Sequence, residues 1–436
     1  MVRFEAVREV HETVNVQMMR RVDRWIGVPM CALLTGVRRL DDLLLRRSPS
    51  GPPKRIAVIK LAEQGATVLA YSALSRAQAM VGAENLFFVV FSENRFILDL
   101  LNVVPRGNVI VIRTDGPVRL VIDTLRAVLR MHRERIDATV DFEFFARSSA
   151  ILSYLSGARA RAGYHAFFGE ASYRGDLMTH RHGFNPFLHA SEMFQSLVES
   201  LRGSPTDLPA MELRPLKDEA LPRLQPSSDE VAELEDIVRA ELAVERTPPL
   251  ILLNANCGDL LPLRRWPTNR YVELAKRLIE RLPEARIVLT GAPDEASQAE
   301  ALVAQINSES CISMAGKTSL RQLLVLYGLA EVMVTNDSGP AHYATLTPID
   351  VITLFGPETP AVFGARTPNS HMMWAGLACS PCVNAFNDRQ SACRHNICME
   401  RITVDMVFAK VVEVWSKRRG LSADELPVAS ELREAP

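Results

Sequence analysis

The chain has 436 residues, which at about 150 residues per domain is enough for two or three domains. Its 50 basic and 51 acidic residues give a net charge of −1, so no overall basic excess is available to grip a nucleic-acid backbone. Apolar residues make up 47% and charged residues 23% of the chain, which excludes a mainly disordered protein and predicts a globular one.

No run of about 18 mainly apolar residues is present, so we expect no transmembrane helix. Acidic and basic side chains alternate through the first 24 residues, which does not fit a cleavable signal peptide. Seven cysteines, an odd number, argue against a complete disulfide framework and favour a cytoplasmic protein.

The first 55 residues hold 11 basic and 6 acidic side chains, a local charge of +5. Apolar residues recur there at spacings of three and four, which predicts an amphipathic helical extension over residues 1–50, interrupted near Gly27 and Pro29. Its apolar positions are Val7, Val10, Val14, Met18, Val22, Trp25, Met30, Leu33, Leu34, Val37, Leu40 and Leu44, flanked by Arg20, Arg21, Arg24, Arg38, Arg39, Arg46 and Arg47. Two interpretations stay open: a helix pair lying on an anionic membrane surface, or an extension packed on the protein's own core.

After this extension, β-like runs alternate with helical segments, as in βαβ units on a parallel sheet. The predicted strands are 56–61, 86–91, 109–112, 139–142, 250–254, 286–290, 311–314, 332–335 and 351–355, and the predicted helices are 66–79, 118–131, 271–281, 295–306, 320–329 and 403–418. Linker-like stretches at 48–53 and 208–228 predict an N-terminal domain over 51–225, a C-terminal domain over 226–402, and a final helix and tail over 403–436. The fold class is α/β, with two Rossmann-like domains facing a cleft where ligands bind beyond the carboxyl ends of the strands.

Four loops of the second half follow predicted strands and can converge on one ligand. The segment 334–342 (Val-Thr-Asn-Asp-Ser-Gly-Pro-Ala-His) ends a strand and starts a helix near Pro340, whose free N–H groups and dipole suit a diphosphate. Gly339 lets a ligand approach the backbone there. Arg264, in the loop after strand 250–254, can neutralise charge on a nucleotide leaving group, and Glu295 can accept hydrogen bonds from ribose hydroxyls.

These motifs, in this order, resemble glycosyltransferase family 9, the bacterial heptosyltransferases of lipopolysaccharide core assembly and their relatives. The matching segments of the second half are Arg-Trp-Pro (265–267), Gly-Ala-Pro-Asp-Glu (291–295), Gly-Lys-Thr-Ser-Leu (316–320), Asn-Asp-Ser-Gly-Pro-Ala-His (336–342) and Leu-Phe-Gly-Pro (354–357). In the first half, 55–61 followed by Gly65, 157–163, and 185–189 with Glu192 also resemble family segments. The resemblance extends over about residues 55–407.

The resemblance implies a GT-B fold and inverting transfer of a heptose-like sugar, with no required cofactor or metal. The implied donor is a nucleotide-diphosphate sugar, ADP-heptose first, and the implied acceptor is a lipopolysaccharide-core or other lipid-linked glycan. It implies work in the cytoplasm, at the inner face of the bacterial inner membrane, with no nucleic-acid partner. Its donor-binding residues correspond here to Arg264, Glu295, Thr318, Asp337, Ser338, Gly339, Pro340, Ala341 and His342.

The sequence departs from the family where the acceptor is activated. The family usually has Gly-Asp in its first turn, with that Asp taken as the catalytic base, whereas this chain has Gly65-Ala66 on the acceptor side. Alanine cannot accept a proton, so Glu63, in the same predicted loop, is the candidate catalytic base. The alternative is a catalytically silent homologue that binds a glycan or nucleotide sugar as a partner module.

Four cysteines near the end of the second domain form a further cluster: Cys379, Cys382, Cys393 and Cys398. Thiols at such spacings can hold Zn²⁺ tetrahedrally, and the ion expected here is structural. The alternative is a set of reduced or disulfide-paired thiols that brace a long loop.

Overall fold

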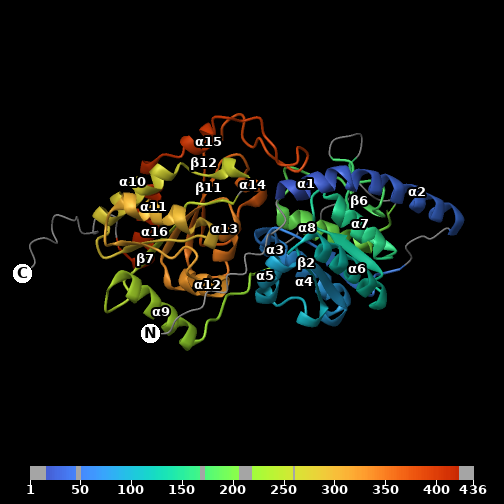
Figure 1. The fold of residues 1–436 in the computed structure, drawn as a ribbon, viewed down its shortest axis with the longest axis horizontal. Helices are drawn as coiled ribbons and strands as arrows, with labels where there is room; N and C mark the ends of the chain where they lie inside the picture. Colours follow the sequence, from blue (N-terminus) through green and yellow to red (C-terminus); the bar gives the residue numbers. More distant parts are fainter. Residues whose placement is uncertain (1–15, 46–50, 167–171, 206–218, 259–260, 422–436) are drawn as a thin grey trace, which may run out of the picture. The chain divides into compact units, whose positions relative to one another are not determined.

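The computed structural model describes residues 16–45, 51–166, 172–205, 219–258 and 261–421, and it divides into two compact units (Figure 1). Unit 1 comprises residues 1–185 and 191–219, and unit 2 comprises residues 186–190 and 220–436. Most of the predicted linker at 208–228, part of that at 48–53, and the start of the amphipathic extension lie outside the described residues.

Unit 1 is built on a six-stranded parallel sheet in the order β3-β2-β1-β4-β5-β6. Its strands are β1 (Ile56–Ile59), β2 (Leu86–Phe91), β3 (Val109–Ile112), β4 (Ala138–Asp141), β5 (Ala160–Tyr164) and β6 (His180–His182). The helices of this half are α1 (Val16–Trp25), α2 (Gly27–Leu45), α3 (Gln64–Leu69), α4 (Tyr71–Val81), α5 (Arg95–Leu101), α6 (Pro117–Arg133), α7 (Arg147–Leu155) and α8 (Ala190–Glu199).

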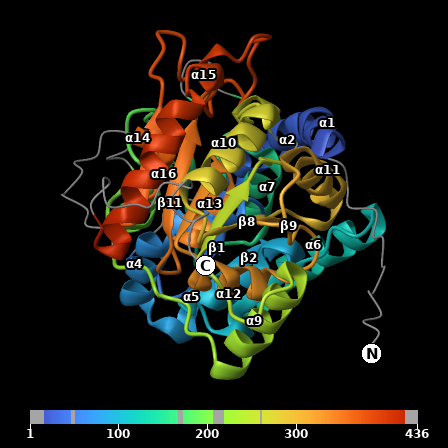
Figure 2. The same ribbon diagram turned by 90° about the vertical axis from the view of Figure 1, so that its left-hand side faces the viewer.

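Unit 2 repeats this design with a parallel sheet in the order β12-β11-β10-β7-β8-β9. Its strands are β7 (Leu250–Asn254), β8 (Arg286–Leu289), β9 (Cys311–Ser313), β10 (Val332–Asn336), β11 (Asp350–Phe355) and β12 (Ser370–Trp374). Its helices are α9 (Ser228–Leu242), α10 (Thr268–Arg281), α11 (Ala296–Ile306), α12 (Leu320–Leu329), α13 (Gly339–Ala344), α14 (Pro360–Phe363), α15 (Ile397–Glu400) and α16 (Val404–Arg419). Figure 2 shows α10 and α16 on one side of this sheet and α9 and α12 on the other.

The central strands are buried along their whole length because helices cover both faces of each sheet. All residues of β1, β7 and β10 are buried, as expected for parallel strands inside an α/β sandwich. On one face of the second sheet, Trp266 and Trp415 are fully buried in the core between β7, α10 and α16. The predicted α/β class with two Rossmann-like domains is confirmed.

Both sheets reverse their strand order beside the first strand, and this reversal positions the candidate sites. In unit 1 the order reverses between β1 and β4, where Ile59 is in register with Asp141. In unit 2 it reverses between β7 and β10, where Asn254 is in register with Thr335. Loops that leave these paired carboxyl ends diverge to opposite faces, which creates the crevice where doubly wound proteins bind ligands.

The described part of the amphipathic extension forms two helices, α1 and α2, that follow each other end to end and pack against α7. The Ile26 N–H donates to the Val22 carbonyl at 2.9 Å and the Met30 N–H donates to the Ile26 carbonyl at 3.1 Å, so helical hydrogen bonding continues across the junction of this α1–α2 helix pair. Cys31 and Leu34 of α2 lie in a small core with residues of α7, and the Asp23 carboxylate accepts hydrogen bonds from the Arg147 and Ser148 backbone N–H groups at 3.0 Å. Arg38 is only 12% exposed and pairs with Asp176 at 2.8 Å, so this arginine does not border the apolar stripe as expected.

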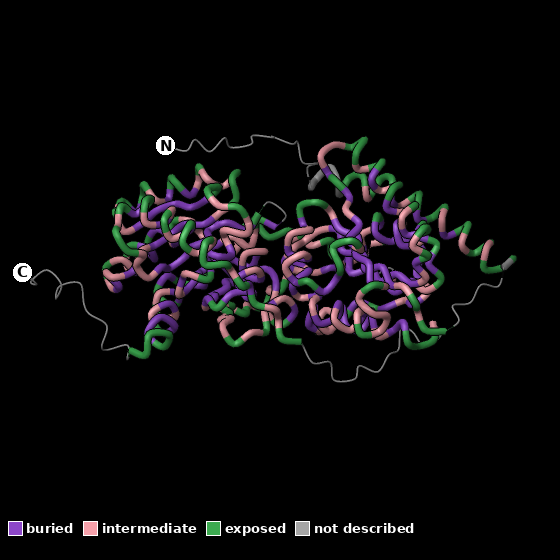
Figure 3. The backbone as a smooth tube through the Cα atoms, turned by 90° about the horizontal axis from the view of Figure 1, so that it is seen from below, coloured by how far each residue is buried: buried purple, intermediate pink, exposed green. Residues whose placement is uncertain are grey.

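The other face of the helix pair is exposed. The contact with α7 agrees with an extension packed on the protein's own core, and the membrane interpretation stays a prediction. Trp25 is 77% exposed, Leu33 63% and Leu43 76%. In Figure 3 the outer side of α2, the long helix at upper right, is exposed, whereas the strands are buried. Among the helices that the structure describes, none is both long and apolar enough to cross a bilayer.

Candidate donor and acceptor sites

Asn336, the last residue of β10, ties three segments of unit 2 together. Its amide nitrogen donates to the Ala255 and Asn256 carbonyls at 3.1 and 3.2 Å. Its amide oxygen accepts from the Trp266 N–H at 2.9 Å and from the Tyr271 hydroxyl at 3.2 Å. The side chain is fully buried, so each of these bonds is made away from water. Asn336 thereby fixes the loop after β7 and the arginine-bearing loop against the end of β10.

Two acids and two arginines gather where β10 and β11 end. One Arg264 nitrogen lies 3.8 Å from Asp337 and 3.5 Å from Glu358, and Arg389 lies 3.6 Å from the other oxygen of Glu358. Both carboxyl groups are nearly buried, with residue exposures of 2% and 3%. The two guanidinium groups at least balance the charge of the two acids, and guanidinium groups suit an anionic ligand.

Burial raises the pKa of the Asp337 carboxyl well above its ordinary value, the neighbouring Glu358 raises it further, and Arg264 opposes both effects. The Asp337 carboxyl therefore holds its proton more readily than an exposed carboxyl does. A carboxyl whose folded-state pKa is raised resists ionisation in the fold, so its contribution to stability is lost as pH rises from the unfolded pKa toward the folded one.

We therefore expect Glu358→Gln to flatten the loss of stability with rising pH. The glutamine removes the like charge and leaves both arginines, so Asp337 ionises at lower pH and costs the fold less. Thermal midpoints measured from about pH 5 to about pH 8 should converge or cross in favour of the variant at the alkaline end. Glu280→Gln, on the exposed side of α10, is the control and should run parallel to the parent. Parallel curves for Glu358→Gln would show that Glu358 does not raise the pKa of Asp337.

Glu295 lies in the 3-10 turn η7 (Pro293–Glu295) after β8, and its side chain is partly committed to the protein. One carboxylate oxygen accepts from the Ala292 N–H at 2.8 Å. Burial raises its pKa, while hydrogen bonds from Ala292 and Asn256 lower it. The contact with Asn256 places Glu295 next to the β7 loop, and the remaining acceptor capacity of the carboxylate suits a ribose hydroxyl.

Several buried polar atoms around these loops have no hydrogen-bond partner within the described residues. They include the Asn256 amide oxygen and the Nε atoms of Arg264 and Arg265. Buried polar atoms are normally paired, so an unpaired set at the carboxyl edge of a sheet indicates a place for a polar ligand. Arg265 thus lies beside Arg264 in this loop, with a buried Nε atom of its own.

The remaining predicted donor residues lie around the start of α13 and in the loop before α12. Ser338 is the N-terminal cap of α13, but its hydroxyl donates to the Asn336 carbonyl at 3.2 Å instead of capping the helix. A Cβ on Gly339 would lie 2.4 Å from the Tyr343 hydroxyl, so the glycine makes room for a side chain of its own helix. Pro340 occupies the first helical turn, Ala341 and His342 are buried, and Thr318 is half-buried beside the cap of α12.

The acceptor side of unit 1 is organised by a buried lysine. Lys60 directly follows β1, is fully buried, and donates to Glu63 at 3.0 Å and to Glu143 at 2.9 Å. Glu143, two residues beyond β4, also accepts from the Leu61 and Ala62 N–H groups at 2.7 and 3.1 Å. The two acids therefore meet across the reversal point of the sheet, with one ammonium group between them.

Glu63 has a backbone that most residues avoid, with φ at 67° and ψ at 78°. Such left-handed conformations cost free energy in a residue with a side chain and cluster at functional sites. The Glu63 side chain is 25% exposed, so it reaches solvent while Lys60 holds one of its oxygens. Gly65 and Ala66 lie in the first turn of α3 and not in a loop, because this helix begins at Gln64.

Sequence reasoning missed four residues that this geometry brings into the two sites: Lys60, Glu143, Asn336 and Glu358. Each stands at or within three residues of the end of a parallel strand. That position was the available signal, but their partners come from distant segments of the chain.

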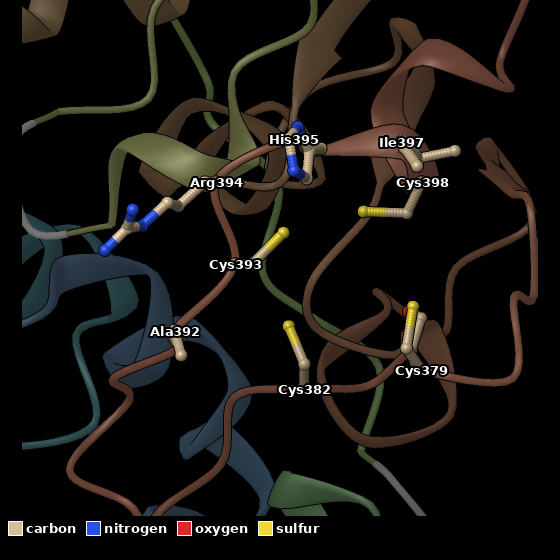
Figure 4. A pocket seen from close by; sticks show the side chains of 9 residues that line it. Cys379, Cys382, Ala392, Cys393, Arg394, His395, Ile397 and Cys398 are labelled. Carbon is tan, nitrogen blue, oxygen red and sulfur yellow. The ribbon is translucent and has the colours of Figure 1, made fainter.

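The four clustered cysteines line one cavity of about 270 Å³ in unit 2. Figure 4 shows the sulfur atoms of Cys382, Cys393 and Cys398 directed toward it, with Cys379 at its edge. All four are free thiols. Within the described residues, no three histidine, cysteine or acidic side chains are gathered closely enough to hold a metal ion. The thiols thus share a cavity, but this arrangement does not yet form a coordination shell.

Comparison with solved structures identifies the fold as the GT-B fold of glycosyltransferases. The E. coli ADP-heptose lipopolysaccharide heptosyltransferase II aligns with a TM-score of 0.61 at 20% identity, over 84% of this chain and 99% of that one. The glycosyl transferase family 9 protein of Veillonella parvula aligns with a TM-score of 0.63 at 16% identity, over 85% of this chain and 99% of that one. The chain belongs to glycosyltransferase family 9 (heptosyltransferase), whose model matches residues 131–392, more than half of its length.

Sequence comparison with curated proteins also finds heptosyltransferases. Lipopolysaccharide heptosyltransferase 2 of Salmonella typhimurium is 30% identical over 151 residues, which are 34% of this chain and 42% of that protein. Lipooligosaccharide heptosyltransferase 2 of Haemophilus ducreyi is 30% identical over 203 residues, or 42% of this chain and 56% of that protein. The matched part of the chain thus spans about half the length of these relatives.

Proposed function

We propose that this protein is an inverting glycosyltransferase that moves a heptose-like sugar from a nucleotide-diphosphate sugar, ADP-heptose first, to a lipopolysaccharide-core or other lipid-linked glycan. The observation that carries the proposal is the arginine and carboxyl cluster at the carboxyl edge of the unit 2 sheet. Family membership supports the reaction class, and the heptosyltransferase relatives support the choice of sugar.

In this proposal, unit 2 binds the donor. Arg264 and Arg265 lie in the loop that Asn336 fixes, and they neutralise the charge that builds on the nucleoside diphosphate as it leaves. Asp337 and Glu358 keep Arg264 oriented and present carboxyl oxygens to the sugar hydroxyls. Glu295 and Thr318 contact the nucleoside, and the residues of the α13 turn surround the phosphates.

Unit 1 prepares the acceptor. An acceptor hydroxyl becomes nucleophilic as its proton leaves, and Glu63 is the carboxylate with an exposed side chain at the reversal point of this sheet. Lys60 holds Glu63 beside Glu143 by donating hydrogen bonds to both carboxylates. The new glycosidic bond forms as the bond to the diphosphate breaks, and the hydroxyl proton passes to Glu63.

A donor panel tests the proposal. The purified protein is incubated with ADP-heptose, UDP-glucose or GDP-mannose, each with and without a glycolipid acceptor, and nucleoside diphosphate release and product mass are measured. Acceptor-dependent release of ADP from ADP-heptose supports the proposal. Transfer from another nucleotide sugar alone, or neither binding nor turnover with any donor, would overturn it.

The second candidate function, a catalytically silent homologue, is favoured by one observation: Ala66 occupies the place of the family's usual acid. It predicts tight binding of ADP or ADP-heptose by calorimetry with no turnover in the same donor panel. The two candidates therefore differ in turnover and agree in binding.

We also propose that the exposed face of the α1–α2 helix pair contacts an anionic membrane surface on the cytoplasmic side of the inner membrane, where a lipid-linked acceptor is available. Trp25, Leu33 and Leu43 supply the apolar contact, and Arg21, Arg24 and Arg39 supply exposed or bordering charge. The face that packs on α7 holds the helix pair in place on unit 1.

A structural zinc ion in the cysteine cluster remains a prediction. If the four thiols close around one ion, protein purified under reducing conditions should carry about one equivalent of zinc, and chelation should lower its thermal midpoint. Cys382→Ser should lose the metal, whereas Cys311→Ser, a buried cysteine of β9 outside the cluster, should retain it. A metal-free preparation whose thermal midpoint is insensitive to added zinc would contradict the prediction.

A further inference from the structure

Helix α6 carries an apolar face that the rest of unit 1 does not cover. Its exposed apolar side chains recur at spacings of three and four and form one stripe: Val118 (71% exposed), Val121 (58%), Ile122 (42%), Leu125 (58%) and Leu129 (56%). The opposite face packs on the sheet through Ala127 and Met131. A helix needs only one apolar stripe to join a core, so the second stripe lacks a purpose inside the unit.

The segment around this stripe is basic. Residues 106–135 contain seven arginines: Arg106, Arg113, Arg119, Arg126, Arg130, Arg133 and Arg135. They contain three acids, Asp115, Asp123 and Glu134, so the local charge is +4. The arginine side chains face outward, with Arg119 56% and Arg126 67% exposed, whereas their partners Asp115 and Asp123 are 16% and 7% exposed. The outer surface of α6 therefore combines an apolar stripe with a positive border.

Helix α6 lies on the same side of the unit 1 sheet as the α1–α2 helix pair. Helix α7 contacts α6 and also contacts both α1 and α2. Figure 1 shows α2, α7 and α6 following one another along this side of unit 1. The exposed stripes of α2 and α6 thus belong to one helical layer, with α7 between them.

We propose that α6 is a second membrane-docking face, which lies with the α1–α2 helix pair on an anionic bilayer. Charge decides between lipid and protein as the occupant. A second copy of the chain would set arginine borders against each other, whereas anionic headgroups neutralise them as the apolar side chains enter the acyl boundary. The inference extends the membrane contact of the proposed function, but it concerns lipid binding and requires no donor or acceptor.

Docking through two helices also orients the protein. Docking through the end-to-end helices α1 and α2 alone permits the protein to rotate about their long axis. Two apolar stripes in one layer fix which side of unit 1 faces the lipid. The α2–α7–α6 layer then meets the bilayer, and the carboxyl edge of the unit 1 sheet, which holds Glu63, lies along the border of this layer. A lipid-linked acceptor held in the same bilayer can reach that edge without leaving the membrane surface.

The full-length protein is tested by sedimentation with vesicles of phosphatidylcholine containing about 30% phosphatidylglycerol, and with pure phosphatidylcholine vesicles, at low and high salt. The α6 variant is Leu125→Gln with Leu129→Gln, two exposed positions where polar side chains suit the helix. The matched control is Met406→Gln, which is 47% exposed on α16 of unit 2. The α6 variant should bind the anionic vesicles at least tenfold more weakly than the parent, and Met406→Gln should bind as the parent does.

A second variant, Arg119→Gln with Arg126→Gln, keeps the stripe and removes border charge. It should weaken binding to anionic vesicles at low salt, and that deficit should shrink at high salt, where the parent's electrostatic contribution is screened. A variant of the α1–α2 helix pair, Trp25→Gln with Leu33→Gln, should also weaken binding to anionic vesicles, independently of the α6 substitutions. Circular dichroism and thermal midpoints confirm that each variant is folded.

If both α6 variants bind vesicles as the parent does and the Trp25→Gln/Leu33→Gln variant has lost binding, the proposal is overturned and the α1–α2 helix pair is the docking element. A parent that sediments as a dimer without lipid, and becomes monomeric in the Leu125→Gln/Leu129→Gln variant, would overturn it in favour of a second copy as the occupant. A parent protein that binds the vesicles but transfers no sugar would contradict the proposed enzyme activity and would still support α6 as a docking face.

Discussion

Glu63→Gln should lower the turnover number by about 10²- to 10⁴-fold and leave donor affinity unchanged, because a positioned general base contributes about that factor. The substitution keeps the size of the side chain and its bond from Lys60 but removes the basic oxygen. Donor affinity is a property of unit 2 in this proposal, so ADP binding by calorimetry should match the parent. Turnover is measured with saturating donor and acceptor.

Ala66→Asp supplies the complementary test, because it restores a carboxylate in the first turn of α3. It should preserve or raise activity in the parent and rescue part of the activity of Glu63→Gln. Glu84→Gln, an exposed acid elsewhere in unit 1, is the matched control and should leave turnover unchanged. Full activity in Glu63→Gln would move the base elsewhere, with Glu143 the next carboxylate to test. Transfer by Ala66→Asp alone, with none in the parent, would identify a silenced enzyme.

The central strands could be predicted from the sequence because they are buried on both faces. Strands 86–91 and 250–254 have the bounds that their mainly apolar runs predict, because helices cover both faces of the sheet, and the edge strand 109–112 also has its predicted bounds. The inner strand β5 and the edge strands β6 and β12 were not among the predicted strands. The sequence of β6 is His-Arg-His, and β12 has half-exposed positions, so neither strand carries the apolar run that marks a covered strand.

Helix bounds followed the same logic, with one instructive error. The predicted helix 66–79 is two helices, α3 and α4, joined at Ala70. Alanine-rich periodicity continues across that junction, and nothing in the residues marks a break. Glu63 and the start of α3 consequently belong to one strained turn, which places the carboxylate beside Lys60 and not in an open loop.

The donor site was partly readable because its residues follow strands in sequence. Arg264, Glu295 and Asp337 each stand in such a loop, and parallel strands bring their carboxyl ends to one edge. Glu358 could not be recognised in this way, because its importance comes from contact with Asp337 and Arg264, which precede it in other loops. Lys60 was hidden for a similar reason: a lysine at the end of a buried strand is normally a surface residue, and only the approach of Glu143 explains its burial.

The exposed face of α6 is the opposite case. Periodicity correctly predicted a helix at 118–131, but an amphipathic pattern does not say how much of its apolar face a core will cover. The structure covers one face and leaves Val118, Leu125 and Leu129 in solvent. A similar division in α2, where Cys31 is buried and Leu33 exposed, explains why the extension both packs on α7 and presents a surface.

Arg264 is the donor-site residue whose removal should cost most among those of unit 2. Its guanidinium is 13% exposed and lies within 4 Å of Asp337 and Glu358, so its position is set before a ligand arrives. A preorganised cation of this kind acts on the charge that develops as the diphosphate leaves, without reorganising at the moment of reaction. Arg389, on the far side of Glu358, approaches that acid at 3.6 Å.

Arg264→Gln should therefore lower kcat/KM by about 10²- to 10³-fold, or about 2.7–4 kcal/mol of transition-state stabilisation, with most of the loss in kcat. Arg264→Lys keeps the charge but not the planar fork, so it should recover only part of that loss. Lys276→Gln removes an exposed positive charge from α10 and should leave both constants unchanged, which separates a local effect from a change in overall charge. Initial rates against donor concentration give kcat and KM for each variant. A parental kcat/KM in folded Arg264→Gln would exclude this arginine from leaving-group stabilisation and transfer the role to Arg265, the adjacent arginine of the same loop.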